Sequence, residues 1–358
     1  MALREALAAG SFSVTAELNP PMDPVAEPVR ATAAALKGLI VAANVTDNAA
    51  ATVKITPLAA ATWMLEAGLE PIMQVTTRDR NIMALQSELL GAWALGVRNI
   101  LALSGDPLKV GKYGELATKV TDLDSLGLVK LIRRLNDGEL AAGETLTTKT
   151  GFYVASAMNP LVDTAAKVEA KIAAGTQFFQ TNIVYDVPRF ASWLKPLTGA
   201  GTLDGIPVLV GVMPPRSTRA LEHMHNNIPG VEVDDATFAR LAGLSGDDAK
   251  EAGVAVAADV ITALREVPGV AGVHIMAPGW EAEAVTRVVH AAGLDALRLH
   301  HRWRRLGRQC PREPAVRRSG QPGARLGGGK ARLPVGRLHP HAGGADVPDR
   351  QPVLRLGV

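Results

Sequence analysis

The sequence is poor in cysteine, with Cys310 alone among 358 residues, which excludes an internal disulfide framework and suits a reducing compartment. No run of 18 or more apolar residues occurs, so a membrane span is not expected. The first residues lack the basic start and the long apolar stretch of a signal peptide. These absences predict a cytoplasmic protein. Aromatic residues are also scarce at 4%, but the hydrophobic content of 47% is ample for a sizeable core.

Acidic residues are scarce at one end of the chain. Residues 298–358 hold 13 arginines and 1 lysine against 3 acidic residues, a net charge of +11, whereas residues 1–297 hold 24 basic and 32 acidic residues, a net charge of −8. Arg, Gly and Pro supply 30 of those last 61 residues, and no apolar period of 2 or 3.6 persists there. We therefore expect a folded domain over 1–297 and a tail over 298–358 without a core.

The composition of the tail begins abruptly inside an otherwise regular domain. Arg/Gly/Pro/Ala/His-rich sequence of this kind is typical of GC-rich DNA that is read out of frame, and we interpret the tail in this way. The alternative is a disordered arm for nucleic acid or an acidic partner, but aromatic residues apart from Trp303 and admixed lysines are missing. We expect no nucleic-acid partner and no membrane partner.

Short apolar runs of strand length recur eight times along the first 297 residues, with helical patterns between them. The near-continuous apolar character of these runs indicates a parallel sheet that is covered on both faces. Eight strand–helix repeats predict an α/β fold, the (β/α)8 TIM barrel, rather than a doubly wound sheet, because no G-x-G-x-x-G follows the first strand. The expected strands span 12–18, 39–46, 71–77, 99–104, 152–158, 178–184, 207–213 and 270–276.

Helical apolar spacing occurs at 82–95, 125–135, 162–174 and 258–264, and Asn81 is a natural N-cap for the first of these segments. The stretch 215–269 is long enough to hold more than one helix. The longest non-helical loop, 105–123, is a candidate flap over an active site.

Two acidic residues stand out at expected strand ends. Glu17 lies inside an apolar run before Pro20 and Pro21, where it has no helix to cap and is costly to bury without a purpose. Asp106 follows another strand in a Gly-Asp-Pro turn. Because the carboxyl ends of barrel strands meet at one mouth, we expect these carboxylates in one crevice.

Other polar residues at strand ends have structural explanations as well as functional ones. Asp47, Asn48, Asp79 and Asp186 are as well explained as caps of the following helices, and His274 as a satisfied core or rim histidine. No metal site is predicted, because the histidines at 223 and 225 have no Cys/His cluster or H-x-x-x-H spacing around them.

Six ordered motifs resemble the methylenetetrahydrofolate reductase family, in its short bacterial form that has the catalytic barrel alone. Each motif is weak by itself, but all six stand in the family's order at barrel strand ends. They are T-A-E-L-N-P-P at 15–21, N-V-T-D at 44–47, T-T-R-D-R-N at 76–81, A-L-S-G-D-P at 102–107, K-I-A-A-G-T through Y-D at 171–186, and G-V-M-P-P at 211–215.

The resemblance implies a flavoenzyme that reduces 5,10-methylenetetrahydrofolate to 5-methyltetrahydrofolate, with FAD as cofactor and NADH or NADPH as the source of hydride. It implies that Glu17 is the general acid, that Asp106 is a fixed charge beside flavin and folate, and that Asn182 contacts the folate. It places the cofactor at Thr46, Gln74, Asp106, Ala155, Asn159 and Lys171. A homo-oligomer, or a partner subunit that delivers electrons, is also implied.

Three positions depart from the family pattern. Asn182 is one methylene shorter than the family's glutamine, Ser104 stands where well-studied members have arginine, and Gln74 replaces a flavin-contacting histidine. Flavin-independent relatives also exist. Two alternatives therefore stay open: a barrel methyltransferase that uses a reduced pterin, and a non-catalytic folate-binding subunit.

Overall fold

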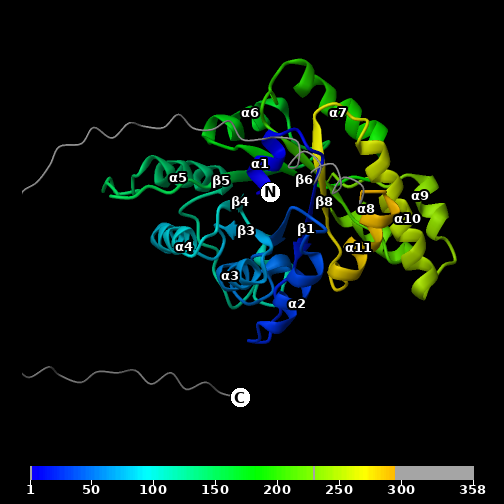
Figure 1. Cartoon of the computed structure of the whole chain (residues 1–358), viewed down its shortest axis with the longest axis horizontal. Helices are drawn as coiled ribbons and strands as arrows, with labels where there is room; N and C mark the ends of the chain where they lie inside the picture. Colours follow the sequence, from blue (N-terminus) through cyan, green and yellow to red (C-terminus); the bar gives the residue numbers. More distant parts are fainter. Residues whose placement is uncertain (1, 229, 295–358) are drawn as a thin grey trace, which may run out of the picture. The chain divides into compact units, whose positions relative to one another are not determined.

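A computed structural model describes residues 2–228 and 230–294. Eight parallel strands form one closed barrel in chain order, and the first strand pairs with the last (Figure 1). The predicted (β/α)8 barrel and all eight of its strands are confirmed. The strands are β1 (Ser13–Leu18), β2 (Ala42–Val45), β3 (Glu70–Thr76), β4 (Asn99–Leu103), β5 (Tyr153–Met158), β6 (Phe178–Ile183), β7 (Val208–Val212) and β8 (Val270–Ile275).

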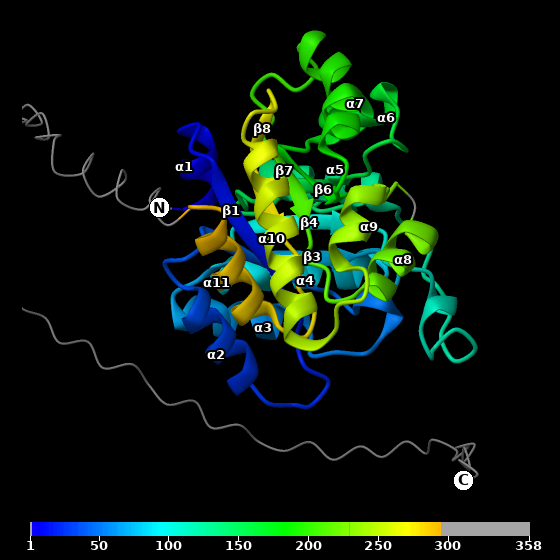
Figure 2. The same ribbon diagram turned by 90° about the vertical axis from the view of Figure 1, so that its right-hand side faces the viewer.

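The helices surround the barrel (Figure 2). They are α1 (Leu3–Ala8), α2 (Glu27–Leu36), α3 (Pro57–Ala67), α4 (Ile82–Ala94), α5 (Ser125–Asp137), α6 (Ala165–Ala174), α7 (Val187–Gly199), α8 (Thr218–Asn227), α9 (Asp235–Leu241), α10 (Gly246–Leu264) and α11 (Glu281–Ala291). Two 3-10 turns, η1 (Ala49–Ala51) and η2 (Leu108–Val110), lie in loops that follow strands.

Local sequence signals set several helix boundaries. The Asn81 side chain accepts a hydrogen bond from the amide of Ala84, 2.9 Å away, so the predicted N-cap of α4 is confirmed. Helix α6 begins at 165 rather than at 162, because the Thr164 side chain caps it by accepting from the amide of Lys167. The stretch 215–269 contains α8, α9 and α10, as its length predicted.

The barrel interior is apolar toward the amino ends of the strands. Leu3 and Leu7 of α1 are buried against inward-facing residues such as Leu101 and Leu209, and Tyr153 stacks on Phe178 with ring centroids 4.7 Å apart. A second and larger apolar layer lies between the outer face of the sheet and the helices. The lower interior is therefore a packed core, which leaves the carboxyl end of the barrel for a site.

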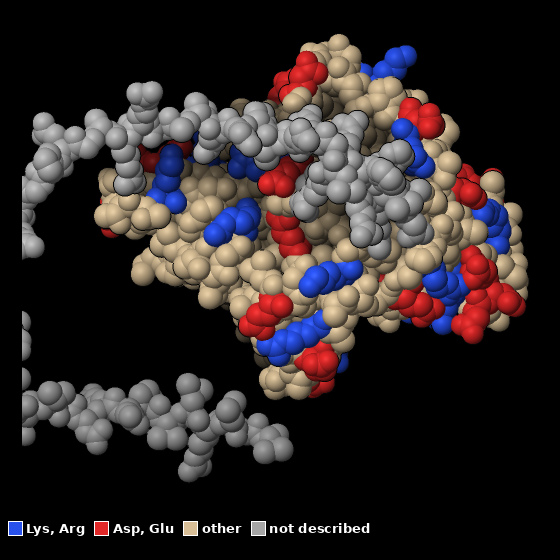
Figure 3. Space-filling view, in the orientation of Figure 1, with Lys and Arg blue, Asp and Glu red and all other residues tan. Residues whose placement is uncertain are grey.

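None of the described helices is long and apolar enough to cross a membrane. On the face shown in Figure 3, acidic and basic side chains are interspersed rather than gathered into a single patch of one sign. The predictions for the tail, namely its start near 298, its out-of-frame origin and the position of Cys310, lie outside the described residues.

Candidate active site

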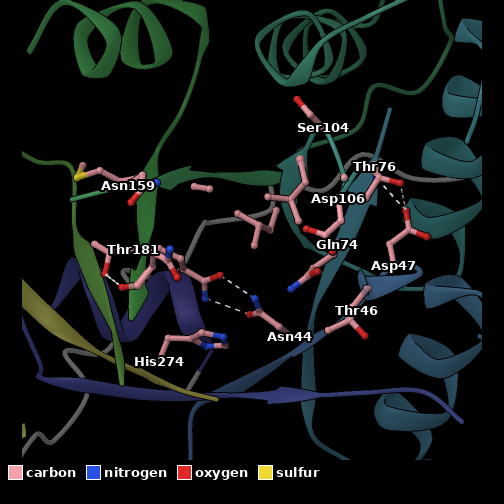
Figure 4. A pocket seen from close by; sticks show the side chains of 18 of the residues that line it. Asn44, Thr46, Asp47, Gln74, Thr76, Ser104, Asp106, Asn159, Thr181 and His274 are labelled. Carbon is pink, nitrogen blue, oxygen red and sulfur yellow. Dashed lines mark hydrogen bonds between the residues drawn. The ribbon is translucent and has the colours of Figure 1, made fainter. Parts of the chain in front are cut away.

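A cavity of about 510 Å³ opens at the carboxyl ends of the strands, and the side chains around it come from strands on all sides of the barrel (Figure 4). Its lining brings together seven of the eight residues that the sequence singled out: Glu17, Thr46, Gln74, Asp106, Asn159, Lys171 and Asn182. Residues 90 or more positions apart, such as Glu17 and Lys171, thus face one space. Among the described residues, no group of three or more His, Cys, Asp or Glu could hold a metal ion.

Ala155 is the exception among the expected site residues. It is fully buried in the lower barrel interior, packed with Leu101 and Phe178, and it does not line the cavity. Side chains alternate along a strand, so the next inward-facing residue of β5 is Ala157, which is exposed and does line the cavity. Ala155 thus lies one inward layer below the cavity, and its expected contact with the cofactor stays a prediction.

Glu17 lies at the end of β1, half-buried in the cavity wall. Burial raises its pKa from 4.5 to about 7, the carboxylates of Glu281 and Asp106 act in the same direction, and hydrogen bonds from Gln74 and Asn19 oppose them. The Gln74 amide nitrogen is 3.5 Å from Glu17 Oε2, which is a long contact. Glu17 therefore keeps a substantial protonated fraction near neutral pH, as a general acid requires.

Asp106 has a different environment, although it lines the same cavity. Its side chain is exposed, and Oδ2 accepts a hydrogen bond of 2.7 Å from the backbone amide of Ala50 in the loop after β2. Its backbone carbonyl accepts from Arg78, 2.9 Å away. The hydrogen bond from Ala50 thus holds the Asp106 carboxyl group in place at the cavity wall.

The backbone that donates to Asp106 is conformationally unusual. Asn48, Ala50 and Ala51 have φ values of 47°, 53° and 50°, in the left-handed region that alanine seldom adopts. The loop 105–123 packs directly on this turn, because a Cβ at Gly111 would lie 2.1 Å from the carbonyl oxygen of Ala51. The candidate flap is thus seated on the strained turn beside Asp106, and its role as a flap stays a prediction.

Asp47 does not cap a helix. Its Oδ2 accepts from the Thr76 amide at 2.8 Å and from the Thr76 hydroxyl at 2.9 Å (Figure 4). Both of its carboxylate oxygens also bind the guanidinium of Arg80. Asp79 likewise pairs with Arg78, whose hydrogen bonds hold the pKa of Asp79 below its ordinary value. Of the residues considered as caps, Asp186 does cap a helix, because it accepts from the amide of Arg189 at the start of α7.

An amide pair closes the cavity from below, and the sequence reasoning missed it. Asn44 of β2 donates to Gln180 of β6 at 2.7 Å, and Gln180 donates back at 3.0 Å (Figure 4). In the closed strand order β2 and β6 lie on opposite sides of the barrel, so the pair bridges the interior. The sequence does show two polar residues, Asn44 and Gln180, inside apolar strands. Nothing in the sequence indicates that these two residues bind one another.

His274 is a buried and neutral histidine. Burial lowers its pKa to about 3, and its Nδ1 lies 3.1 Å from the hydroxyl of Thr15. That hydroxyl also lies 3.3 Å from the carbonyl oxygen of Val273. His274 lines the cavity, but it carries no charge at physiological pH and is therefore a poor proton donor.

Two lysines mark one side of the cavity. The Lys171 ammonium lies 2.7 Å from Asp163 Oδ2 and donates to the carbonyl of Ala157 at 2.7 Å, and Lys167 pairs with the other oxygen of Asp163. Burial acts to raise the pKa of Asp163, but these lysine contacts lower it below its ordinary value. An adjoining groove of about 210 Å³ shares both lysines and reaches Ser125 at the start of α5.

The fold and this cavity define a (β/α)8 barrel with two carboxyl groups, those of Glu17 and Asp106, at the carboxyl ends of its strands. The family model for methylenetetrahydrofolate reductase matches residues 2–293, and the chain belongs to this family. The resemblance drawn from the six motifs is thereby confirmed.

Two fungal relatives and one solved structure illustrate the range of the similarity. Methylenetetrahydrofolate reductase 1 of Schizosaccharomyces pombe is 25% identical over 231 residues, 63% of this chain and 36% of the relative. Methylenetetrahydrofolate reductase 2 of Saccharomyces cerevisiae is 31% identical over 152 residues, 41% of this chain and 24% of the relative. The chain thus matches about a third or less of the length of these relatives.

The solved structure is an uncharacterized protein from Clostridium thermocellum that binds two copies of 5-methyl-5,6,7,8-tetrahydrofolic acid. It has a TM-score of 0.59 and 15% identity, over 82% of this chain and 99% of the other. At this identity the likeness concerns the fold.

Proposed function

We propose that the protein reduces 5,10-methylenetetrahydrofolate to 5-methyltetrahydrofolate in the cytoplasm, with a bound flavin and with NADH or NADPH as the source of hydride. The observation that carries the proposal is the convergence of Glu17 of β1 and Asp106 of the loop after β4 on one cavity at the carboxyl ends of the strands, where burial raises the pKa of Glu17. Family membership and the folate-binding structural neighbour support a folate substrate.

The residues of the cavity fit FAD. The volume of about 510 Å³ lies within the range of roughly 300–1,000 Å³ that is usual for small-molecule sites. Leu101 and Leu103 give the cavity an apolar wall for a planar ring, and Lys167 and Lys171 place positive charge beside the adjoining groove, where a diphosphate would need it. We propose that Thr46, Gln74, Asn159 and Lys171 hold the cofactor, which would supply hydride when bound.

Glu17 and Asp106 then have unequal roles in the reaction. Protonated Glu17 donates its proton to a nitrogen of the five-membered ring of the folate, and the ring opens to a cationic iminium. Asp106 holds a negative charge beside this cation and stabilises it. Asn182 lies at the cavity wall, where its Oδ1 accepts from the amide of Ile183 at 2.8 Å, and we propose that its side chain contacts the pterin. Burial of Glu17 favours its neutral form before the transfer.

Replacing the proton donor is the direct test. Glu17→Gln should still allow NAD(P)H to reduce the flavin, but it should slow folate reduction by about 10²–10⁴-fold, the usual contribution of a general acid. Glu27→Gln, an exposed acid of α2, is the matched control and should leave both half-reactions unchanged. If Glu17→Gln reduces folate at the parental rate, Glu17 is not the acid.

A visible spectrum of the purified protein tests the cofactor separately. We expect flavin absorption, or its appearance after incubation with FAD, followed by bleaching on addition of NADH or NADPH. Protein that takes up no flavin but transfers a methyl group from 5-methyltetrahydrofolate would instead be a methyltransferase. Flavin that is bleached by dithionite but by neither nicotinamide would indicate an electron-delivering partner subunit.

A further inference from the structure

A second glutamate lies next to Glu17 but outside the cavity lining. Strand β8 pairs with β1, so the segment after β8 runs beside the end of β1 and brings the start of α11 to that point. There the Asn19 side-chain amide donates to Oε1 of Glu281 at 3.0 Å. Asn19 follows Glu17 by two residues. One amide side chain therefore stands beside the proposed acid and binds a second carboxyl group.

The orientation of the Asn19 amide is fixed from its other side. The Thr46 hydroxyl donates to Asn19 Oδ1 at 3.1 Å, which directs the Asn19 nitrogen toward the glutamates. This nitrogen has two hydrogens, and the hydrogen bond to Glu281 occupies one of them. Glu281 thus takes one of the two donor hydrogens of Asn19, and only the other remains for Glu17.

Within residues 2–228 and 230–294, the other groups around Glu17 provide no compensating positive charge. Asp106 approaches from the loop after β4, Gln74 of β3 is neutral, and His274 of β8 is neutral because burial lowers its pKa to about 3. Asp47, beyond β2, is bound to Arg80. Lys171, which lines the same cavity, is paired with Asp163.

We propose that Glu281 is a positioning residue that holds Glu17 in its acid form, with Asn19 as the oriented amide between the two carboxyl groups. The inference deepens the proposed function and rests on it for the part that concerns turnover. A neighbouring carboxylate disfavours ionisation of Glu17, and an amide that already donates to Glu281 has only one hydrogen left for the Glu17 anion. Among the influences on the pKa of Glu17, that of Glu281 is larger than that of Asp106.

Glu281 also has an ordinary structural explanation. It is the first residue of α11, where a negative charge interacts favourably with the helix dipole. Glu283 stands in the same first turn, is exposed and pairs with Arg287. Glu283→Gln therefore removes the same charge from the same helix end without touching Asn19, and it is the matched control for Glu281→Gln.

The test is a carbon-13 NMR titration of the Glu17 carboxyl group in the purified protein, with its resonance assigned by its loss in Glu17→Gln. In Glu281→Gln the pKa of Glu17 should fall by about half a unit to one unit, whereas Glu283→Gln should leave it unchanged. Glu281→Asp, which keeps a carboxylate, should restore most of the shift. Equal values in the parent, Glu281→Gln and Glu283→Gln would overturn the inference.

Turnover provides a second measurement that separates this inference from the proposed function. The alkaline limb of the pH profile for folate reduction should move to lower pH by the same amount in Glu281→Gln, while flavin reduction by NAD(P)H stays unchanged. A shifted NMR pKa in a protein without folate activity would contradict the proposed function and leave the role of Glu281 intact. A pKa shift without movement of the alkaline limb would overturn the link to catalysis.

Discussion

The two ends of the barrel interior are built by the same strands and have opposite character. At the amino ends, Leu3 of α1 and the stacked rings of Tyr153 and Phe178 fill the space with apolar side chains. At the carboxyl ends, the amides of Asn44 and Gln180 and the acid Glu17 face a cavity. Inward-facing side chains change from apolar to polar within one layer. Two residues along β6, for example, separate Phe178 of the apolar core from Gln180 at the cavity.

The difference shows how polar residues inside a barrel are tolerated. Transferring an amide or a carboxyl group out of water is costly unless it is hydrogen-bonded or neutral. Asn44 and Gln180 satisfy one another, and Glu17 is held partly neutral. At the amino ends of the strands, burial of apolar side chains contributes stability. At the carboxyl ends, hydrogen bonds and neutralisation offset most of the cost of burying polar groups, which remain available for chemistry.

The largest expected effect on stability lies at the lower end. Phe178 is fully buried and stacked on Tyr153, so Phe178→Ala should lower the free energy of unfolding by about 3–5 kcal/mol. Denaturant unfolding measures the loss, and the molecules that remain folded should retain binding of the proposed flavin. Loss of flavin binding without loss of stability would contradict the division between the two ends.

At the carboxyl ends of the strands, substitution of Glu17 should raise the free energy of unfolding rather than lower it. Its folded pKa of about 7 is raised above the ordinary value of 4.5, so its contribution to stability falls as pH rises through this window. At pH 8 the free energy of unfolding of Glu17→Gln should therefore exceed that of the parent by up to about 3 kcal/mol, and the two should match near pH 4. Equal stability of the two proteins at pH 8 would show that Glu17 is not desolvated.

The amide pair should give a smaller effect, and one that is not additive. Asn44→Leu leaves the buried amide of Gln180 without its partner, at a cost of about 1–3 kcal/mol. The double variant Asn44→Leu/Gln180→Leu should recover part of this loss, which a double-mutant cycle in urea measures. Additive losses would mean that the two amides do not depend on one another.

The sequence predicted the parts of this molecule that depend on local pattern. Eight apolar runs gave the barrel, Asn81 gave the start of α4, and an acid in an apolar run led to Glu17. These features are encoded within a few residues of one another. The six ordered motifs added the family, which the family model confirms over residues 2–293.

The remaining features depend on contacts that local pattern does not encode. Ala155 lies below the cavity in the apolar cluster that Leu3 and Leu7 of α1 help to fill, and the depth of this cluster depends on contacts between distant segments. Asn44 and Gln180 are 136 residues apart, and Asn19 and Glu281 are 262 apart. Asp47 was considered as a cap because its partners, Thr76 and Arg80, belong to the next strand and its loop.

The bridge between Asn44 and Gln180 also separates two properties of the site that can change independently. Both residues lie within strands, so insertions or deletions in the loops beyond the strands leave the bridge at the same level. The strands then set how deeply the ring of a bound molecule can enter the cavity, and the loops set how wide the mouth of the cavity is. Exchange of loops can thus alter which molecules enter without altering how deeply they sit.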